Sequence, residues 1–265
     1  MVVEAPYVAA RRKAGQFIIL RIDETGERIP LTIAAADSAA GTITLYYQVV
    51  GKTTRHLKEL AAGETIRDIA GPLGHPTEIM EYGTAVCIGG GIGIAPLYPI
   101  ATALREAGNR VINIIGARNK DLLIMEEELS KAGDEIVVCT DDGSHGRKAF
   151  VTEALQEILD REPVHIVVAV GPVPMMKAVS EMTKPRGIKT MVSLNSIMID
   201  GTGMCGGCRV TVAGERRFTC VDGPEFDGHQ VDFSELTERL GTYRDAEKES
   251  MDRFDHQCRL GLERR

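Results

Sequence analysis

The sequence lacks the features that mark membrane, secreted and nucleic-acid-binding proteins. Its most apolar stretch, residues 84–104, is interrupted by four glycines and two prolines, so we predict no membrane-spanning helix. No apolar run follows a basic region near residue 1, so we expect no secretory signal. Acidic residues outnumber basic ones by 38 to 31, and like charges do not cluster in long blocks. We therefore expect a cytoplasmic protein that has neither a nucleic acid nor a membrane as its partner.

The composition is that of an ordinary folded chain. With 265 residues, 43% hydrophobic and 26% charged, the chain is long enough for two or three small domains. Six cysteines in a cytoplasmic protein are expected to be thiols or metal ligands and not disulfides. Cys87 and Cys139 lie inside apolar runs and are predicted to be core residues, whereas Cys258 is isolated and supports no prediction.

Residues 16–74 read as short strands separated by turns. The runs 16–22, 28–34 and 42–50 are rich in β-branched and aromatic residues, which predicts a small antiparallel barrel. A helix is predicted over 54–60, and the amides at its start, which Gly51 precedes, are a possible phosphate site. Arg28 places a cation beside the second strand, although a lone arginine is more often a surface charge.

From Tyr82 to residue 194 the pattern changes to alternating strands and helices. Apolar runs rich in Val and Ile, without polar alternation, indicate strands that are buried on both faces. The predicted strands are 85–90, 110–117, 135–140, 165–171 and 189–194, and the predicted helices are 94–108, 121–133, 149–162 and 174–184. We therefore predict a five-stranded parallel sheet covered by helices on both sides.

Three loops at the carboxyl ends of these strands suggest a nucleotide site. The glycine-rich run 89–93 lies between a strand and a helix, where bare amides and the helix amino terminus favour a pyrophosphate. Segments 139–146 and 170–178 fall on the same edge. A structural turn is the alternative for the glycines. Arg118 is a candidate contact for a 2'-phosphate, but the spacing leaves NAD and NADP both open.

The segment after residue 194 carries a metal-binding pattern. Cys205 and Cys208 form a C-x2-C pair, Cys220 follows a predicted hairpin that turns at residues 213–214, and Asp200 stands five residues before Cys205. This D-x4-C-x2-C-x11-C spacing is that of a plant-type 2Fe-2S site in which the first cysteine is an aspartate. A zinc site built from the same cysteines with Asp200 or His229 is the alternative.

The order of these motifs resembles the ferredoxin-NADP reductase superfamily. The runs RIPLT, GPLG, GGGIGIAPL, TDDGSHG and GPVPMMKA, followed by the cysteine segment, are most similar to the electron-transfer subunits related to that of dihydroorotate dehydrogenase. DGTGMCGGC running into FTCVDGPEFDGHQVDF looks most like the small subunits of NADH-dependent reduced ferredoxin:NADP oxidoreductases, also called sulfide dehydrogenase subunit beta. The resemblance covers about residues 2–233.

This resemblance implies an architecture and a function. It implies an FAD-binding barrel over 1–78, an NAD(P)-binding α/β domain over 79–194, a 2Fe-2S segment over 195–233 and a charged, helical tail over 234–265. It implies a hydride exchanged between NAD(H) and FAD, and single electrons passed through the cluster to a larger flavin and iron-sulfur subunit. The implied heterodimer couples NADH, NADPH and ferredoxin in electron bifurcation, and ferredoxin acts through that complex.

The resemblance also assigns site residues, with no residue in acid or base catalysis. In the flavin motif, the arginine meets the FAD phosphate and the threonine lies near the isoalloxazine. The implied flavin residues are Arg28, Pro30, Leu31, Thr32, Gly51, Thr53, Thr54, Gly71, Pro72, Leu73 and Gly74. The implied nucleotide residues are Gly90, Gly91, Gly93, Asp141, Asp142, Gly171, Pro172 and Met175. The implied cluster ligands are Asp200, Cys205, Cys208 and Cys220.

Two other readings of the sequence stay open. The same cofactors would serve an electron-transfer subunit of dihydroorotate dehydrogenase or of a sulfide or polysulfide reductase. Asp200 argues against the dihydroorotate enzyme, in which a cysteine would be expected at that position. A zinc-stabilised binding or regulatory module, with structural glycine loops, belongs to a different class.

Relatives usually carry about one more strand before the position of Met1, so we expect either that the native start lies upstream or that the barrel lacks its first strand. Because an unpaired barrel edge loosens a site built on it, we predict that the chain retains FAD weakly. The measurement is the FAD content of the chain before and after gel filtration. A full complement of FAD in the protein peak would contradict the prediction.

Overall fold

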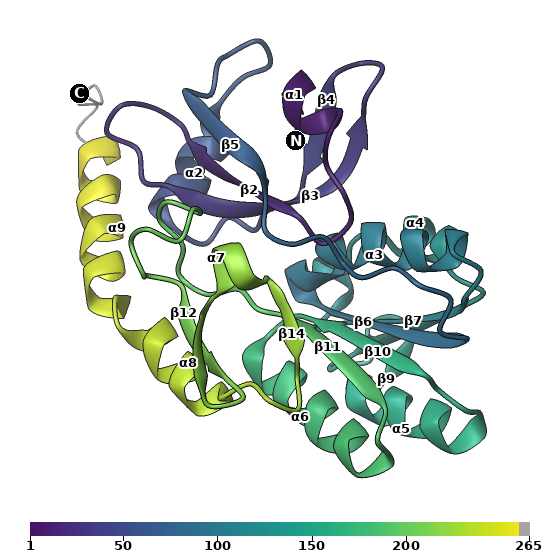
Figure 1. Ribbon diagram of the computed structural model, residues 1–265. Helices are drawn as coiled ribbons and strands as arrows, with labels where there is room; N and C mark the ends of the chain where they lie inside the picture. Colours follow the sequence, from purple (N-terminus) through teal and green to yellow (C-terminus); the bar gives the residue numbers. More distant parts are fainter. Residues whose placement is uncertain (260–265) are drawn as a thin grey trace.

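The computed structural model describes residues 1–259, and side chains through Phe254 (Figure 1). The amino-terminal part is a curled antiparallel half-barrel with strand order β1-β4-β3-β2-β5. Its strands are β1 (Val2–Glu4), β2 (Phe17–Arg21), β3 (Ile29–Asp37), β4 (Thr42–Leu45) and β5 (Asp68–Leu73), and its helices are α1 (Pro6–Ala9) and α2 (Lys52–Glu59). Ile18, Leu20 and Ile33 fill its interior. Val2–Glu4, where we predicted no strand, pairs with β4.

The second sheet confirms the predicted parallel core and extends it. Strands β6 (Thr84–Gly90), β7 (Arg110–Ala117), β8 (Glu135–Thr140), β10 (Ile166–Val170) and β11 (Lys189–Ser193) are parallel neighbours in the order β11-β10-β6-β7-β8. Two short edge strands were not predicted: β9 (Arg147–Lys148), which runs parallel to β8, and β14 (Glu225–Asp227), which runs antiparallel to β11. The whole sheet therefore has seven strands.

Helices cover both faces of this sheet, as the apolar strands require. Helices α3 (Ile94–Glu106) and α4 (Glu126–Ala132) pack on the face toward the half-barrel, and α5 (Val151–Arg161) and α6 (Val173–Thr183) pack on the other (Figure 1). Three short 3-10 turns, η1 (Gly91–Gly93), η2 (Lys120–Leu122) and η3 (Lys184–Arg186), join the elements. The helix predicted over 121–133 begins only at Glu126, because Met125 adopts a left-handed backbone with φ of 55°.

The carboxyl-terminal part is small. Strands β12 (Arg209–Val212) and β13 (Glu215–Phe218) form the predicted hairpin, whose turn residues Ala213 and Gly214 both have positive φ, as a type I′ turn requires. After α7 (Thr219–Asp222) come α8 (Phe233–Gly241) and α9 (Arg244–Arg259). Helix α9 lies beside α2 (Figure 1), so it packs on its own chain. Within residues 1–259, we find no helix with the length and apolarity that crossing a bilayer requires.

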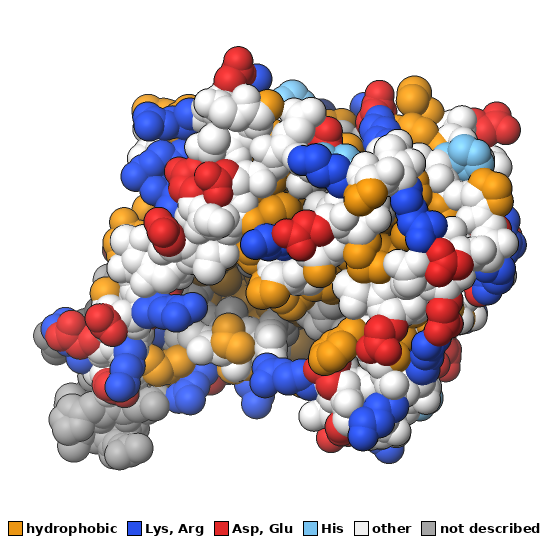
Figure 2. Space-filling view, turned by 90° about the horizontal axis from the view of Figure 1, so that it is seen from below, with side chains coloured by type: hydrophobic (Ala, Val, Ile, Leu, Met, Phe, Trp, Pro, Cys, Tyr) orange, Lys and Arg blue, Asp and Glu red, His pale blue; other side chains and the backbone are white. Residues whose placement is uncertain are grey.

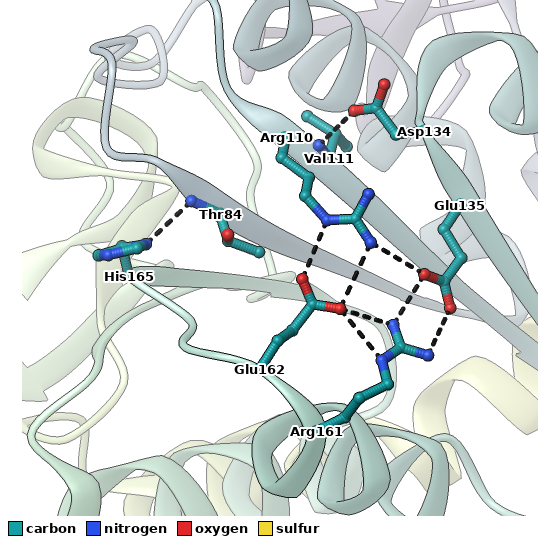
Figure 3. Close-up of polar contacts among 8 residues, drawn as sticks. All are labelled: Thr84, Arg110, Val111, Asp134, Glu135, Arg161, Glu162 and His165. Atoms are coloured by element: carbon teal, nitrogen blue, oxygen red, sulfur yellow. Dashed lines mark hydrogen bonds and ion pairs between the residues drawn. The ribbon is translucent and has the colours of Figure 1, made fainter.

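At the amino-terminal ends of β7 and β8, ion pairs join these strands to the end of α5 (Figure 3). Arg110 at the start of β7 contacts Glu162 at 2.9 Å and Glu135 at 3.2 Å, and Arg161 contacts Glu135 at 2.7 Å. The two guanidinium groups hold the pKa of the Glu162 carboxyl below its usual value. On the face seen from below in Figure 2, acidic and basic side chains are also interspersed. The charges at this edge are therefore matched within the chain.

Candidate functional site

The carboxyl ends of β6 and β10 approach each other more closely than side chains would permit. A Cβ on Gly93 would lie 2.3 Å from the carbonyl oxygen of Val170, and one on Gly90 would lie 2.6 Å from the sulfur of Met175. A Cβ on Gly171 would lie 2.8 Å from the methyl carbon of Met175. The structure thus brings together five predicted nucleotide residues, Gly90, Gly93, Gly171, Pro172 and Met175.

The backbone amides at the start of α3 are not covered by side chains of the glycine run, which suits an anionic ligand. Gly91 has a φ of 55° and no atom within 4 Å of the position its Cβ would take, so its turn opens onto free space. The 3-10 turn Gly91–Gly93 leads directly into the 13-residue helix α3. Amides at such a helix start stabilise phosphate oxygens.

Two predicted nucleotide residues lie further along the same edge. Asp141 and Asp142 follow β8, and the backbone N–H of Asp142 donates to the carbonyl of Arg118 at the end of β7, at 3.2 Å. The carboxylate of Asp142 accepts from the N–H of Ser144 at 2.9 Å, and the bonds from Ser144 lower its pKa. The predicted nucleotide residues therefore form two groups, one at β6 and β10 and one at β7 and β8.

The predicted flavin residues of β3 alternate between its faces. Leu31 packs against the half-barrel interior, so Pro30 and Thr32 face the other way. They pair with Ile19 and Phe17 of β2. Arg28 precedes β3, is exposed and forms no ion pair or hydrogen bond with any residue that the structure describes. Its guanidinium is therefore available to an anionic group.

The two threonines at the start of α2, which the resemblance assigns to the flavin site, are hydrogen-bonded within the protein. The hydroxyl of Thr54 accepts from the N–H of Gly51 at 3.0 Å, and so caps the helix. The hydroxyl of buried Thr53 donates to Glu27 at 2.5 Å. Both hydroxyls are therefore hydrogen-bonded within the protein.

The run Gly71 to Gly74 ends β5 and touches the cysteine segment. Leu73 lies opposite Phe17 in the sheet. Gly74 has a φ of 76°, and a Cβ there would lie 2.8 Å from the ring of Phe17 and 2.9 Å from Pro224. The N–H of His75 donates to the carbonyl of Gly223 at 2.7 Å. These contacts join the half-barrel to residues that follow Cys220.

The four predicted cluster ligands lie on one loop and one short helix. The sulfur atoms of Cys208 and Cys220 are 3.2 Å apart and buried, whereas Cys205 is exposed. The carboxylate of Asp200 accepts N–H groups of Thr202 at 2.8 Å and Cys205 at 2.7 Å, which lower its pKa. Among the described side chains, no three from His, Cys, Asp and Glu converge on a single metal position.

The chemistry of the donor set fits an iron-sulfur cluster. Burial, with the neighbouring Cys208, raises the pKa of the Cys220 thiol to about 12, so a thiolate there needs a bound cation. Backbone N–H groups of Gly207 and Cys220 lie 3.4 Å from the sulfurs of Cys205 and Cys208. Such amide donors to sulfur tune iron-sulfur clusters. His229, the alternative zinc ligand, instead has its Nε2 2.9 Å from the Thr183 hydroxyl.

The cysteine segment packs directly on the half-barrel. Cys208, Cys220 and Met198 share one buried apolar cluster with Phe17 and Ile19 of β2, and Leu73 packs against it. Gly201 has a φ of 75°, and a Cβ there would lie 2.7 Å from both Ile19 and Leu73. The loop of the predicted cluster ligands can therefore approach the strands of the predicted flavin site only because residue 201 is a glycine.

Comparison with known proteins gives this arrangement a family. Residues 195–232 match the iron-sulfur cluster binding domain of dihydroorotate dehydrogenase B, and residues 87–181 match the oxidoreductase NAD-binding domain. A Thermotoga maritima protein described as a homolog of the dihydroorotate dehydrogenase B electron transfer subunit is 49% identical over 252 residues, which are 95% of this chain and 89% of that protein. The chain belongs to the family of dihydroorotate dehydrogenase B electron transfer subunits.

Further relatives support the assignment. The electron transfer subunit of dihydroorotate dehydrogenase B from Fusobacterium nucleatum is 32% identical and covers 88% of this chain and 92% of its own length. A chain of NADH-dependent reduced ferredoxin-NADP oxidoreductase, solved in a study of flavin-based electron bifurcation, superimposes with a TM-score of 0.91, 47% identity and coverage of 96% and 91% of the two chains. A cytochrome P450 reductase from Amycolatopsis shares the fold, with a TM-score of 0.55, 26% identity and coverage of 66% and 57%.

Family membership confirms the resemblance and fixes the cofactors. The electron transfer subunit is an oxidoreductase of the ferredoxin-NADP reductase type, and its cofactors are FAD, a 2Fe-2S cluster and NAD(H). The zinc-stabilised module is therefore wrong for this chain. Motif reasoning did not single out Met198 or Glu225, which lie between the sites, because each stands alone in a segment without periodicity.

We predict that Gly93→Ala disrupts the nucleotide edge. The new methyl group would meet the carbonyl of Val170, and overpacking of this kind costs about 1–3 kcal/mol of folding free energy. The variant should have a lower melting temperature and bind NADH at least about tenfold more weakly. Gly241→Ala is the matched control because no atom lies near its Cβ position. Equal NADH affinity in the two variants would refute the packing argument.

A second prediction concerns Asp200. Because a carboxylate is a harder donor than a thiolate, Asp200→Cys should change both the visible spectrum and the reduction potential of the cluster. Asp222→Asn removes another carboxylate of this segment, which accepts the N–H of Phe218 at 2.6 Å, and should leave both unchanged. If Asp200→Cys behaves like this control, Asp200 is not a ligand.

Proposed function

We propose that this electron transfer subunit oxidises or reduces NAD(H) within a complex that couples NADH, NADPH and ferredoxin by flavin-based electron bifurcation. The similarity to a chain of NADH-dependent reduced ferredoxin-NADP oxidoreductase supports this proposal. We further propose that the functional division of the chain is 1–78 for FAD, 79–194 for the nucleotide, 195–233 for the cluster and 234–265 for the tail. Residues 260–265 of that tail lie outside the described residues.

The observation that carries the proposal is the buried apolar cluster shared by the cysteines and strand β2. Cys208 and Cys220 pack with Ile19 and Phe17, the cross-strand partners of Pro30 and Thr32. We propose that the two predicted cofactor sites, which share this buried apolar core, exchange electrons directly, without a diffusing carrier. Such an arrangement suits a subunit that converts hydride chemistry into single-electron transfer.

When bound, FAD accepts a hydride and the cluster carries single electrons. The residues of this chain supply position and charge. Gly90, Gly91 and Gly93 would leave room for the nucleotide backbone at the start of α3, and Arg28 would pair with an FAD phosphate. Met198 and Leu73 would make the surroundings of both sites apolar.

The exposed side of the cluster loop would receive the larger flavin and iron-sulfur subunit. Cys205 is exposed there, and beside it Met204 is 88% and Ile199 49% exposed. Apolar side chains that project this far from a surface are typical of protein interfaces. We propose that the partner covers this loop in a heterodimer, and that ferredoxin exchanges electrons with the complex.

A second candidate is the electron-transfer role toward dihydroorotate dehydrogenase itself, which the names of the relatives favour. A sulfide or polysulfide reductase is a further alternative. Asp200 stands where the dihydroorotate enzyme would be expected to have a cysteine. The purified native complex separates these roles, because only the proposed function predicts NADPH-dependent reduction of NAD and ferredoxin together.

The test of this function begins with the chain alone. Under anaerobic conditions, the purified chain should contain about two irons, and after FAD is supplied its flavin bands should bleach when NADH is added. The native complex should then oxidise NADPH only when NAD and ferredoxin are both present. Oxidation of dihydroorotate by that complex, without any need for ferredoxin, would replace the proposed function with the second candidate.

A further inference from the structure

A carboxyl group without a cation lies where the three parts of the chain meet. Glu225 is in β14, which joins the cysteine segment to the edge of the parallel sheet. Its Oε1 accepts a hydrogen bond from the hydroxyl of Thr77 at 2.6 Å, and a Cβ on Gly15 would lie 2.7 Å from the same oxygen. Thr77 belongs to the link between the half-barrel and the sheet, and Gly15 precedes β2.

Glu225 also adjoins the predicted flavin site. The preceding residue, Pro224, packs against Gly74, and the carbonyl of Gly223 accepts the N–H of His75. The segment from 223 to 225 thus touches the end of the Gly71 to Gly74 run on one side and the sheet on the other. Cys220, a proposed cluster ligand, is five residues earlier in the chain and lies in the same segment.

No described cation pairs with this carboxylate. Cys87 of β6 is a titratable group that interacts electrostatically with Glu225. Burial raises the pKa of the Cys87 thiol to about 12, so the thiol stays protonated and uncharged. The backbone partner of Glu225 in β11, Ser193, is uncharged. On the surrounding elements, Glu78 pairs with Lys189 and Asp227 lies beside His229. Among the described ion pairs, none joins Arg12 or His75 to Glu225.

The surroundings make Glu225 a proton-accepting group near neutral pH. Burial raises the pKa of its carboxyl to about 7, and the hydrogen bond from Thr77 opposes part of that rise. The residue as a whole is only half-buried, so water can still reach its edge. A small change in the nearby charge is therefore enough to change its protonation.

We propose that Glu225 takes up one proton from water when the redox groups of this chain gain electrons, and releases it when they are oxidised. The inference rests on the proposed function, which places FAD beside Gly74 and the cluster at Cys220. Glu225 acts on the redox groups through its charge and does not touch the reacting atoms of the substrate, so it is a positioning residue.

The charge balance follows from the chemistry of NADH. A hydride carries two electrons and one proton, so its transfer leaves NAD⁺ and adds one negative charge to the flavin site. The carboxylate of Glu225 binds one proton from solvent and becomes a neutral acid, which removes one negative charge from the same region. Added negative charge nearby favours the protonated form, so the uptake is in the required direction.

The same group makes stability depend on pH. Because the folded chain raises the pKa of Glu225 above its unfolded value, the protonated form stabilises the fold, and this contribution is fully present below the unfolded pKa. It is lost as pH rises through about 7. Glu225→Gln should therefore melt at a higher temperature than the wild type at about pH 8, with little difference at about pH 5.

The experiment uses the full chain loaded with FAD and cluster. Its cluster and flavin potentials are measured between about pH 6 and 8 for the wild type, Glu225→Gln and the control Asp227→Asn. In the wild type and the control, the cluster potential should fall as pH rises, and Glu225→Gln should lose that dependence. Thr77→Val removes a hydrogen-bond donor to the carboxylate and so raises the pKa of Glu225. The pH range over which the cluster potential changes should therefore move to higher pH.

The outcomes separate this inference from the proposed function. A chain that binds no FAD or iron would overturn both. A loaded chain whose cluster potential has the same pH dependence in the wild type, Glu225→Gln and Thr77→Val would overturn the role of Glu225 alone. If Glu225→Gln does not fold, Thr77→Val tests the role of Glu225, because the pH shift expected in that variant depends on the native carboxyl. Melting temperatures at the same pH values show independently whether Glu225 titrates.

Discussion

The apolar contact between the cysteine loop and strand β2 is the interaction on which the rest of the arrangement depends. Cys208, Cys220 and Met198 pack against Phe17 and Ile19, and Gly201 lets the loop reach that surface. The segment has little regular structure of its own, so this packing fixes its position. Together with the contacts of Gly74 and His75 with residues 223–224, it joins the predicted cluster site to the predicted flavin site.

The parallel sheet carries the predicted nucleotide site and holds it in a fixed orientation. Its face toward the half-barrel carries α3, which packs on β3, so the glycine-rich loop at the start of α3 lies near the strand of the predicted flavin motif. Matched ion pairs occupy the opposite edge of the sheet. Glu225 remains as a carboxylate without a cationic partner among the described residues, at the junction of all three parts.

The sequence predicted those features of the fold that hydrophobic periodicity and residue spacing determine. Runs of Val and Ile identified the five parallel strands, and the hairpin turn at Ala213 and Gly214 was located from its residues. Strand β5 was missed because Gly71 and Pro72 interrupt its pattern. Strand β14 was missed because a strand of three residues is too short to show an alternating pattern. The bond of the Thr53 hydroxyl to Glu27, and the setting of Glu225, depend on tertiary contacts that no local pattern encodes.

The central claim is that electrons from NADH pass within this chain from the flavin site to the cluster. Freeze-quench EPR of the loaded chain tests it most directly, because the oxidised 2Fe-2S cluster has no EPR signal and the reduced cluster does. The account predicts that, after NADH is mixed anaerobically with the chain alone, flavin bleaching is followed by a reduced-cluster signal. Complete flavin bleaching with a cluster that stays oxidised, although dithionite reduces it, would contradict the account.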